Sequence, residues 1–199
     1  MRVDISIWPV STRPRSQQTH QVVLAATNEL LLEAGFPGVT IERLSTRSGV
    51  STATIYKHWP SKNAIVAEAF GRTATAALTI PECVDPLADL IDFAVASLSF
   101  HSIESGRVFF QLLAACSMEP SGALYFQEYY LGPRRETMLP LFTRAIDAGA
   151  IVADVDINVA IDVIFGAAVF RLMRDTSELD QTTLRNTIEL SLNGLLANK

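Results

Sequence analysis

Residues 35–62 contain two short helical segments on either side of a glycine-containing turn, in the sequence GFPGVTIERLSTRSGVSTATIYKHWPSK. Thr40 and Ser51 suit the N-cap positions of helices at about 40–47 and 51–57, because a hydroxyl oxygen accepts a hydrogen bond from a free backbone N–H of the first turn. The glycine between the helices supplies the backbone freedom of a sharp turn. This pattern predicts a helix-turn-helix, in which the second helix enters the DNA major groove.

The second short helix begins with small side chains and ends with aromatic and cationic ones. The small residues at 52–54 let the backbone approach base edges in the groove. Tyr56, Lys57, His58 and Lys62 are hydrogen-bond donors suited to phosphate oxygens. The sequence therefore predicts contacts to both bases and phosphates from one short segment.

The run GVSTATIYKHWPSKNAIV resembles the TetR family of bacterial one-component transcriptional regulators. The family pattern is a Gly-Val turn, a short recognition helix that ends in Tyr, and then an aromatic residue followed by Ser-Lys. The resemblance extends from the helix containing Val22 to about Phe70, and the rest of the chain is similar to the family only in length and helical pattern. Ser45 and Ser48 stand where Ala is more usual, and Trp59 stands where Phe is.

The TetR resemblance implies a role for each matching position. Thr40, Tyr56, His58 and Lys62 contact phosphates, and the residues at 52–54 face bases. Arg43 and Lys57 reach either a phosphate or a base. The predicted DNA-binding residues are thus Thr40, Arg43, Ser51, Thr52, Ala53, Thr54, Tyr56, Lys57, His58 and Lys62.

Charge is distributed unevenly along the chain. Residues 1–70 carry seven Lys and Arg against five Asp and Glu, whereas the remaining residues carry nine against sixteen. An acidic protein is repelled by DNA unless its basic residues gather at the contact surface. The distribution therefore favours DNA binding through the N-terminal part. Six of its seven basic residues lie in the arm and the helix-turn-helix: Arg13, Arg15, Arg43, Arg47, Lys57 and Lys62.

The hydrophobic pattern predicts helices throughout the chain and no strands, because apolar residues recur at the helical period. Gly132-Pro133 favours a break or kink within residues 121–149, since proline has no backbone N–H. The expected helices span about 16–34, 40–47, 51–57, 61–80, the segment after Pro86, 106–117, 121–149, 156–174 and the segment after Asp180.

These elements predict an all-α protein in two parts. A flexible arm over residues 1–15 precedes a three-helix helix-turn-helix domain over 16–60. An effector-binding and dimerisation domain follows over 61–199, and its first helix, 61–79, connects it to the head. The high hydrophobic fraction of 49% indicates apolar surface buried between subunits or around a ligand.

Aromatic and polarisable side chains are dense between residues 93 and 130. A largely apolar pocket with a few polar groups is the usual environment of a small organic ligand. Core packing is the alternative at each single position. We expect a small apolar or aromatic effector to be bound by Phe93, His101, Phe109, Phe110, Gln111, Met118, Tyr125, Phe126 and Tyr129.

The last two predicted helices differ from the others, because residues 156–174 are apolar on nearly every side. Such a helix is buried against more than one neighbour. Two such helices pair with their copies into an isologous four-helix bundle, and the TetR resemblance implies the same homodimer. Burial within a monomeric core is the alternative. The predicted dimer-interface residues are Ile164, Ala167, Phe170, Ile188, Leu192 and Leu195.

Other classes of protein have little support in the sequence. No stretch approaches the about 20 apolar residues of a membrane span, and two cysteines form no disulfide framework, so we expect a cytoplasmic protein. The three histidines lack partners at metal-ligand spacing, and no nucleophile motif is present, so we expect neither a cofactor nor an enzyme. Two alternatives stay open: a helical ligand-binding or protein-interaction module without specific DNA binding, and redox sensing by Cys83 or Cys116.

Overall fold

The computed structural model describes residues 14–78, 85–100, 104–174 and 180–196. Within these ranges the regular elements are all helical, and an isolated antiparallel bridge joins Ile151 to Leu196. The predicted all-α fold is confirmed. The helices are α1 (Pro14–Gly38), α2 (Ile41–Ser48), α3 (Thr52–His58), α4 (Lys62–Ala76), α5 (Pro86–Ser99), α6 (Glu104–Ser117), α7 (Pro120–Phe126), the π-helical turn η1 (Gln127–Leu131), α8 (Gly132–Asp147), α9 (Ile157–Arg174), α10 (Gln181–Leu192) and the 3-10 turn η2 (Asn193–Leu195).

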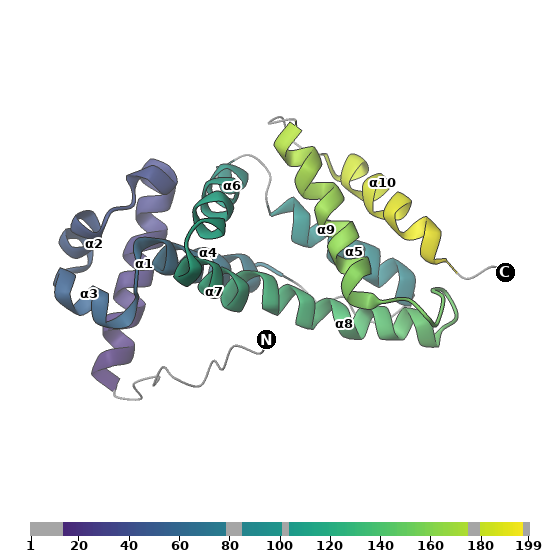
Figure 1. Cartoon of the computed structure of the whole chain (residues 1–199), viewed down its shortest axis with the longest axis horizontal. Coiled ribbons are helices and arrows are strands. Elements are labelled where there is room, and N and C mark those ends of the chain that lie inside the picture. Colours follow the sequence, from purple (N-terminus) through teal and green to yellow (C-terminus); the bar gives the residue numbers. More distant parts are fainter. Residues whose placement is uncertain (1–13, 79–84, 101–103, 175–179, 197–199) are drawn as a thin grey trace.

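The molecule is elongated, with α1, α2 and α3 forming a head at one end (Figure 1). The connecting helix α4 packs on α1, on α7 and on η1, so that it joins the head to the rest of the chain. At the other end, α5 packs on α8 and α10, and α9 packs on α10. The helix pair α9–α10 therefore lies far from the head (Figure 1).

Side chains at the N-cap positions of α2 and α3 define where these two helices begin. The Thr40 hydroxyl accepts from the Arg43 backbone N–H at 3.2 Å, and the Ser51 hydroxyl accepts from the Thr54 N–H at 3.3 Å. Gly49 ends α2 at φ +70°, a left-handed conformation that glycine adopts without a steric cost. The predicted caps and turn are confirmed.

The segment from 120 to 147 is helical throughout, without the break expected at Gly132-Pro133. The chain instead forms the π-helical turn η1 directly before this pair, and Gly132 itself has a helical φ of −56°. Proline cannot donate a hydrogen bond to the preceding turn, and the wider turn, in which the Gly132 N–H donates to the Gln127 carbonyl, lies directly before it. The expected irregularity is present, but as a wider turn rather than a kink between two helices.

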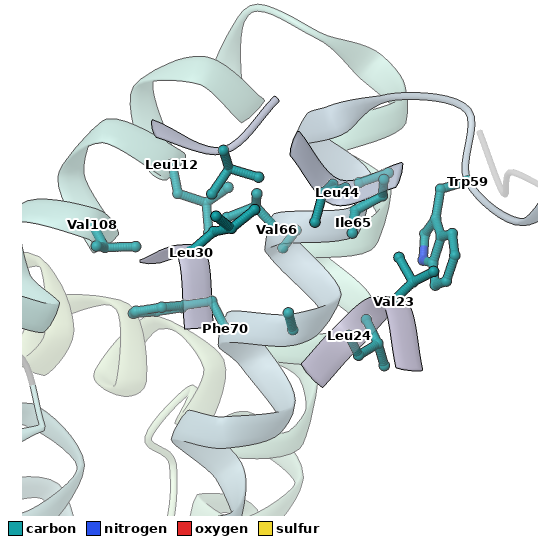
Figure 2. Close-up of a cluster of buried hydrophobic side chains, with 14 of the residues drawn as sticks. Val23, Leu24, Leu30, Leu44, Trp59, Ile65, Val66, Phe70, Val108 and Leu112 are labelled. Atoms are coloured by element: carbon teal, nitrogen blue, oxygen red, sulfur yellow. The ribbon is translucent and has the colours of Figure 1, made fainter. Parts of the chain in front are cut away.

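The interior consists of two apolar clusters. The first cluster joins the head to α4, α6, α7 and η1, and in Figure 2 Leu30, Val66 and Leu112 converge from three different helices. The second cluster lies between α5, α8, α9 and α10. Each fully buried aliphatic or aromatic side chain contributes roughly 1.5–3 kcal/mol to folding. Because the first cluster is continuous across the expected boundary at residue 60, the head is packed directly onto the rest of the chain.

No helix among the described residues is both long enough and apolar enough to cross a membrane.

Candidate nucleic-acid interface

Helix α3 has one buried face and one exposed face. Ile55 and Trp59 are fully buried in the first cluster and hold the helix against the head. Thr52, Ala53 and Tyr56 lie on the exposed face, and 54% of the Tyr56 surface is accessible. Two predicted base-facing residues, Thr52 and Ala53, and one predicted phosphate-facing residue, Tyr56, therefore share an open surface at the tip of the molecule.

The first turn of α3 is held rigid by its own side chains. The Ser51 and Thr54 hydroxyl oxygens are 2.9 Å apart and share a hydrogen bond. The Thr54 hydroxyl is thus oriented by the cap, and it keeps lone pairs or a proton for a base edge. Thr52 and Ala53 are exposed and add little bulk, so this turn can approach a groove closely.

The cations of α2 have different environments. Arg47 makes a two-pronged contact with Glu33, at 2.7 Å for both pairs of atoms, and a third bond of 3.0 Å to Glu29. Hydrogen bonding from Arg47 holds the pKa of Glu33 below its ordinary value. Arg43 donates to the Gly38 carbonyl at 2.6 Å and stays exposed. Both arginines therefore contact α1 at the surface, and Arg47 is the more fully paired of the two.

The predicted phosphate contacts at the end of α3 are partly buried. The Lys62 ammonium lies 4.2 Å from the centre of the Phe36 ring, and burial lowers the pKa of Lys62. Burial and the neighbouring His20 lower the pKa of His58, so the neutral imidazole is favoured. Lys57 is exposed. The structure therefore places one exposed and one partly buried ammonium next to the open face of α3.

A buried carboxylate joins three elements directly behind this surface. Glu68 on α4 accepts from Trp59 Nε1 at 2.7 Å and lies 2.7 Å from His20 Nε2 on α1. Arg72 Nε donates to the same carboxylate at 2.8 Å. Burial alone would raise the pKa of Glu68, but the hydrogen bonds from His20 and Trp59 lower it below the ordinary value.

Sequence reasoning missed Glu68. The one available signal was the tryptophan at position 59, because its indole N–H needs a partner when the ring is buried, whereas phenylalanine does not. Glu68 lies nine residues from Trp59 and 48 residues from His20, so no local pattern identifies this group.

The predicted effector-binding residues are distributed over both clusters. Phe93 is buried in the second cluster, whereas Phe109 and Phe126 are buried in the first. Phe110 and Tyr125 pack against the first cluster and are partly buried. These side chains therefore do not belong to one apolar cluster.

Two of the predicted effector-binding residues point outward, which corrects the expectation that they line an interior pocket. Met118 is 88% exposed at the end of α6, and Gln111 is also exposed. Tyr129 is partly buried beneath Arg72, at 4.9 Å, and His101 lies outside the described residues. A hollow of about 430 Å³ is present elsewhere, beside α9 and η2, and Val152, Val155, Val159, Val163 and Leu195 are among its lining residues.

The predicted dimer residues divide between the core and the surface. Ile164, Ile188 and Leu192 are at most 1% exposed and belong to the second cluster, so they pack inside their own subunit. Leu195 is partly buried against the same cluster. For the three buried residues, the expected exposure to a partner is wrong, because Ile164 of α9 and Ile188 and Leu192 of α10 pack against helices of their own subunit.

The opposite face of α9 is apolar and exposed. Phe170 is 67% exposed, Met173 66%, Val159 56% and Val163 49%, and Ala167 is half-buried between them. Residues three or four positions apart lie on one face of a helix, so these side chains form a continuous stripe. This set is called the α9 stripe below. Sequence reasoning identified Ala167 and Phe170 in it and omitted the other three.

The described cysteine is unreactive by its environment. Burial raises the pKa of Cys116 to about 11, which leaves the thiol protonated at neutral pH. Cys83 lies outside the described residues.

Comparison with known proteins agrees with this arrangement. Residues 23–69 match the family described as "Bacterial regulatory proteins, tetR family", and residues 80–190 match "Tetracyclin repressor-like, C-terminal domain". The chain is 32% identical, over 185 residues and 93% of each protein, to the uncharacterized HTH-type transcriptional regulator YdeS of Bacillus subtilis (strain 168).

Two solved structures are similar over most of the chain. The TetR family transcription regulator SCO0332 is 30% identical, with a TM-score of 0.76 over 89% of this chain and 98% of that one. The fold is also similar to that of the transcriptional regulator FadR from Bacillus subtilis in complex with stearoyl-CoA, at 18% identity and a TM-score of 0.61, over 88% of this chain and 99% of that one. These matches span the head and the remaining helices together, and the chain therefore belongs to the TetR family as a DNA-binding transcriptional regulator.

Proposed function

We propose that this regulator is a repressor in the cytoplasm, that it binds a palindromic operator as a homodimer, and that a small, largely apolar effector releases it. The single observation that supports the dimer is the α9 stripe. Four large apolar side chains on one helix face each expose about half of their surface or more. Large apolar patches on a soluble protein mark interaction surfaces.

A second copy of the chain is the occupant that fits the α9 stripe. A twofold contact places the same apolar surface on both sides, so Phe170 and Met173 of each copy meet apolar side chains. The stripe lies far from α3 (Figure 1), so pairing leaves both heads free. Two heads on successive major grooves require centres about 34–36 Å apart.

The effector part of the proposal is supported by the aromatic middle of the chain. Four aromatic rings pack together on and beside the connecting helix α4: Phe70, Phe109, Phe126 and Tyr130. The ring centres of their contacting pairs are 4.9–6.5 Å apart. The structurally similar FadR was solved in complex with stearoyl-CoA, a ligand with a long apolar chain. A ligand in this region acts on DNA only if its affinity differs between the two arrangements of the heads.

The DNA contacts are tested with duplex fragments from the region upstream of the regulator's own gene. Fluorescence anisotropy at several salt concentrations should show a steep fall of affinity with salt, because phosphate contacts release counterions. Lys57→Ala should weaken binding to all sequences and reduce the salt slope by about 1 for each phosphate that the variant no longer neutralises. Thr52→Val should instead alter base preference, by about 1–3 kcal/mol for a base edge that the side chain no longer recognises.

The matched control is Arg107→Ala, which removes an exposed cation from α6 rather than from α3. It should leave both affinity and salt slope unchanged. Equal losses of affinity in Lys57→Ala and Arg107→Ala would show that general charge, and not the face of α3, determines DNA binding.

A further inference from the structure

Arg134 is a buried cation in the first turn of α8, and only 2% of its surface is exposed. A guanidinium stays protonated in proteins, and a buried charge is unfavourable unless it is paired. Its contacts are with Tyr130, one turn earlier, where Nη1 donates to the backbone carbonyl at 3.1 Å and the guanidinium carbon lies 3.8 Å from the ring centre. Among the described residues, no carboxylate pairs with Arg134. The interior therefore holds a positive charge that these residues do not balance.

The free part of the Arg134 side chain has a specific shape. Nε and Nη2 are both buried and without a hydrogen-bond partner. These two nitrogens form the edge of a guanidinium that presents two parallel N–H groups, and this edge matches the two oxygens of a carboxylate. Because Nη1 is held by the Tyr130 carbonyl, the edge is oriented before any anion arrives.

Two more buried hydroxyls without a hydrogen-bond partner lie on helices that pack against α8 and η1. Ser97 on α5 is fully buried, and its hydroxyl has no partner. Helices α5 and α8 run side by side in opposite directions (Figure 1), with Arg144 3.9 Å from Asp89 at one end, which places Ser97 toward the end that holds Arg134.

Helix α4 contributes the third group. An added Cβ at Gly71 would lie 2.4 Å from the Tyr129 carbonyl oxygen, so α4 contacts η1 closely there. Thr75 follows one turn later on α4, beyond this contact with η1, and its buried hydroxyl is also unpaired.

Apolar surroundings continue on both sides of Arg134 along the same face of the helix. Tyr130, four residues before it, belongs to the first cluster, and Met138, four residues after it, belongs to the second. A ligand whose charged end meets Arg134 would therefore place its remaining atoms among apolar side chains.

We propose that the effector carries a carboxylate, which Arg134 binds side-on through Nε and Nη2, with the hydroxyls of Ser97 and Thr75 as further donors. This inference rests on the proposed release by an effector and names its chemical class: an organic acid with an apolar body. The binding energy comes from pairing a charge that is already buried and already oriented, so the protein loses little hydration when the anion binds.

The test uses three pairs of compounds that differ only in the charged group: decanoate and 1-decanol, 1-naphthoate and 1-naphthol, and 4-phenylbutyrate and 4-phenyl-1-butanol. Titration calorimetry measures their Kd values on the full-length protein. At least one acid should bind about tenfold or more tightly than its alcohol, as expected for a charge-assisted, two-pronged hydrogen bond. Arg134→Met, which is similar in length and uncharged, should reduce this preference to about twofold or less, and Arg134→Lys should give an intermediate value, since lysine keeps the charge but not the paired edge.

Arg135→Met is the matched control, because Arg135 is the next residue and its guanidinium is already bound by Asn158 and Asp162. It should keep the full preference for the acid. The proposal is overturned if no acid is preferred over its alcohol, if the preference survives Arg134→Met, or if Arg135→Met removes it equally.

Operator affinity, measured in parallel with each compound, separates this inference from the proposed function. An acid that binds through Arg134 but leaves operator affinity unchanged would refute release by the effector and leave the anion site intact. Acids and alcohols that release the operator equally would support the release and refute the role of Arg134.

Discussion

Trp59→Phe should destabilise the protein by the free energy of the hydrogen bond between Trp59 and Glu68. The substitution keeps an aromatic ring in the first cluster but removes the indole N–H, which donates to Glu68 Oε2 at 2.7 Å. The Glu68 side chain is only 1% exposed, so water cannot replace the missing donor. A hydrogen bond to a charged group contributes about 1.5–3 kcal/mol, and we expect a loss of stability in that range.

Two further variants assign this loss to the hydrogen bond rather than to ring volume. Trp59→Phe in a Glu68→Leu background should cost less than it does in the wild type, with a coupling energy of about 1.5 kcal/mol or more. Arg72→Ala removes another partner of the same carboxylate, but the Arg72 side chain is 56% exposed and the pair is of the i,i+4 type. Water can take the place of this exposed guanidinium, so the variant should cost less than Trp59→Phe.

Urea unfolding followed by far-ultraviolet circular dichroism measures the three effects. The protomer concentration is kept fixed, because the proposed dimer formation would add to apparent stability. The slope with denaturant should be the same in all variants. A cost of Trp59→Phe below about 0.5 kcal/mol, under the range for a hydrogen bond to a charge, would refute the role of this bond. An equal cost with and without Glu68 would refute it as well.

Three other substitutions or conditions test the remaining features. Phe170→Asp places a charge in the α9 stripe, so sedimentation should show monomers where the wild type gives dimers, whereas a monomeric wild type would refute the interface. Gly71→Ala puts a Cβ within 2.4 Å of the Tyr129 carbonyl oxygen, which should cost about 1–3 kcal/mol in urea unfolding, as overpacking does; an unchanged midpoint would show that α4 and η1 separate freely. Because the pKa of Glu68 is lowered by folding, its contribution to stability is complete above its ordinary value near 4.5 and is lost as pH falls through the lowered value. The stability difference between the wild type and Glu68→Gln should therefore shrink below pH 4.5, and a constant difference would contradict the assignment.

The parts of the fold that the sequence predicted correctly depend on neighbouring residues. A cap at Thr40 or Ser51 needs a hydroxyl and a backbone N–H three positions away, and the turn at Gly49 needs one residue with positive φ. Such features are encoded within about one helical turn, so the pattern of a single sequence is sufficient to find them.

The local sequence pattern does not determine which face of α9 is buried. Ile164 and Phe170 lie on different faces of one helix that is apolar nearly all round. Only the packing of α5, α8 and α10 against it decides that Ile164 is buried and Phe170 is exposed. Hydrophobicity alone identifies a buried helix but not which of its faces meets its own subunit.

The effector region shows the same limit in another form. Aromatic density correctly indicates an apolar interior, but it does not show that Met118 lies outside it or that Phe93 and Phe109 belong to different clusters. The burial of Arg134 was not predicted, because an arginine in a helix is normally solvated. It is buried by the packing of neighbouring helices, which the local sequence does not show.

The π-helical turn η1 sets the rotational phase of everything that follows it on α8. A π turn holds one residue more than an α turn, and each residue of an α-helix advances the chain by about 100° around its axis. Deleting one residue from 127–131 would therefore shorten the segment by about 1.5 Å and also rotate the faces before and after it relative to each other. Tyr130 would then no longer point into the first cluster while Met138 and Phe142 point into the second. In relatives of this chain, single-residue insertions or deletions in this segment should be rarer than substitutions. An insertion or deletion rotates every later face of the helix, whereas a substitution alters the contacts of one side chain.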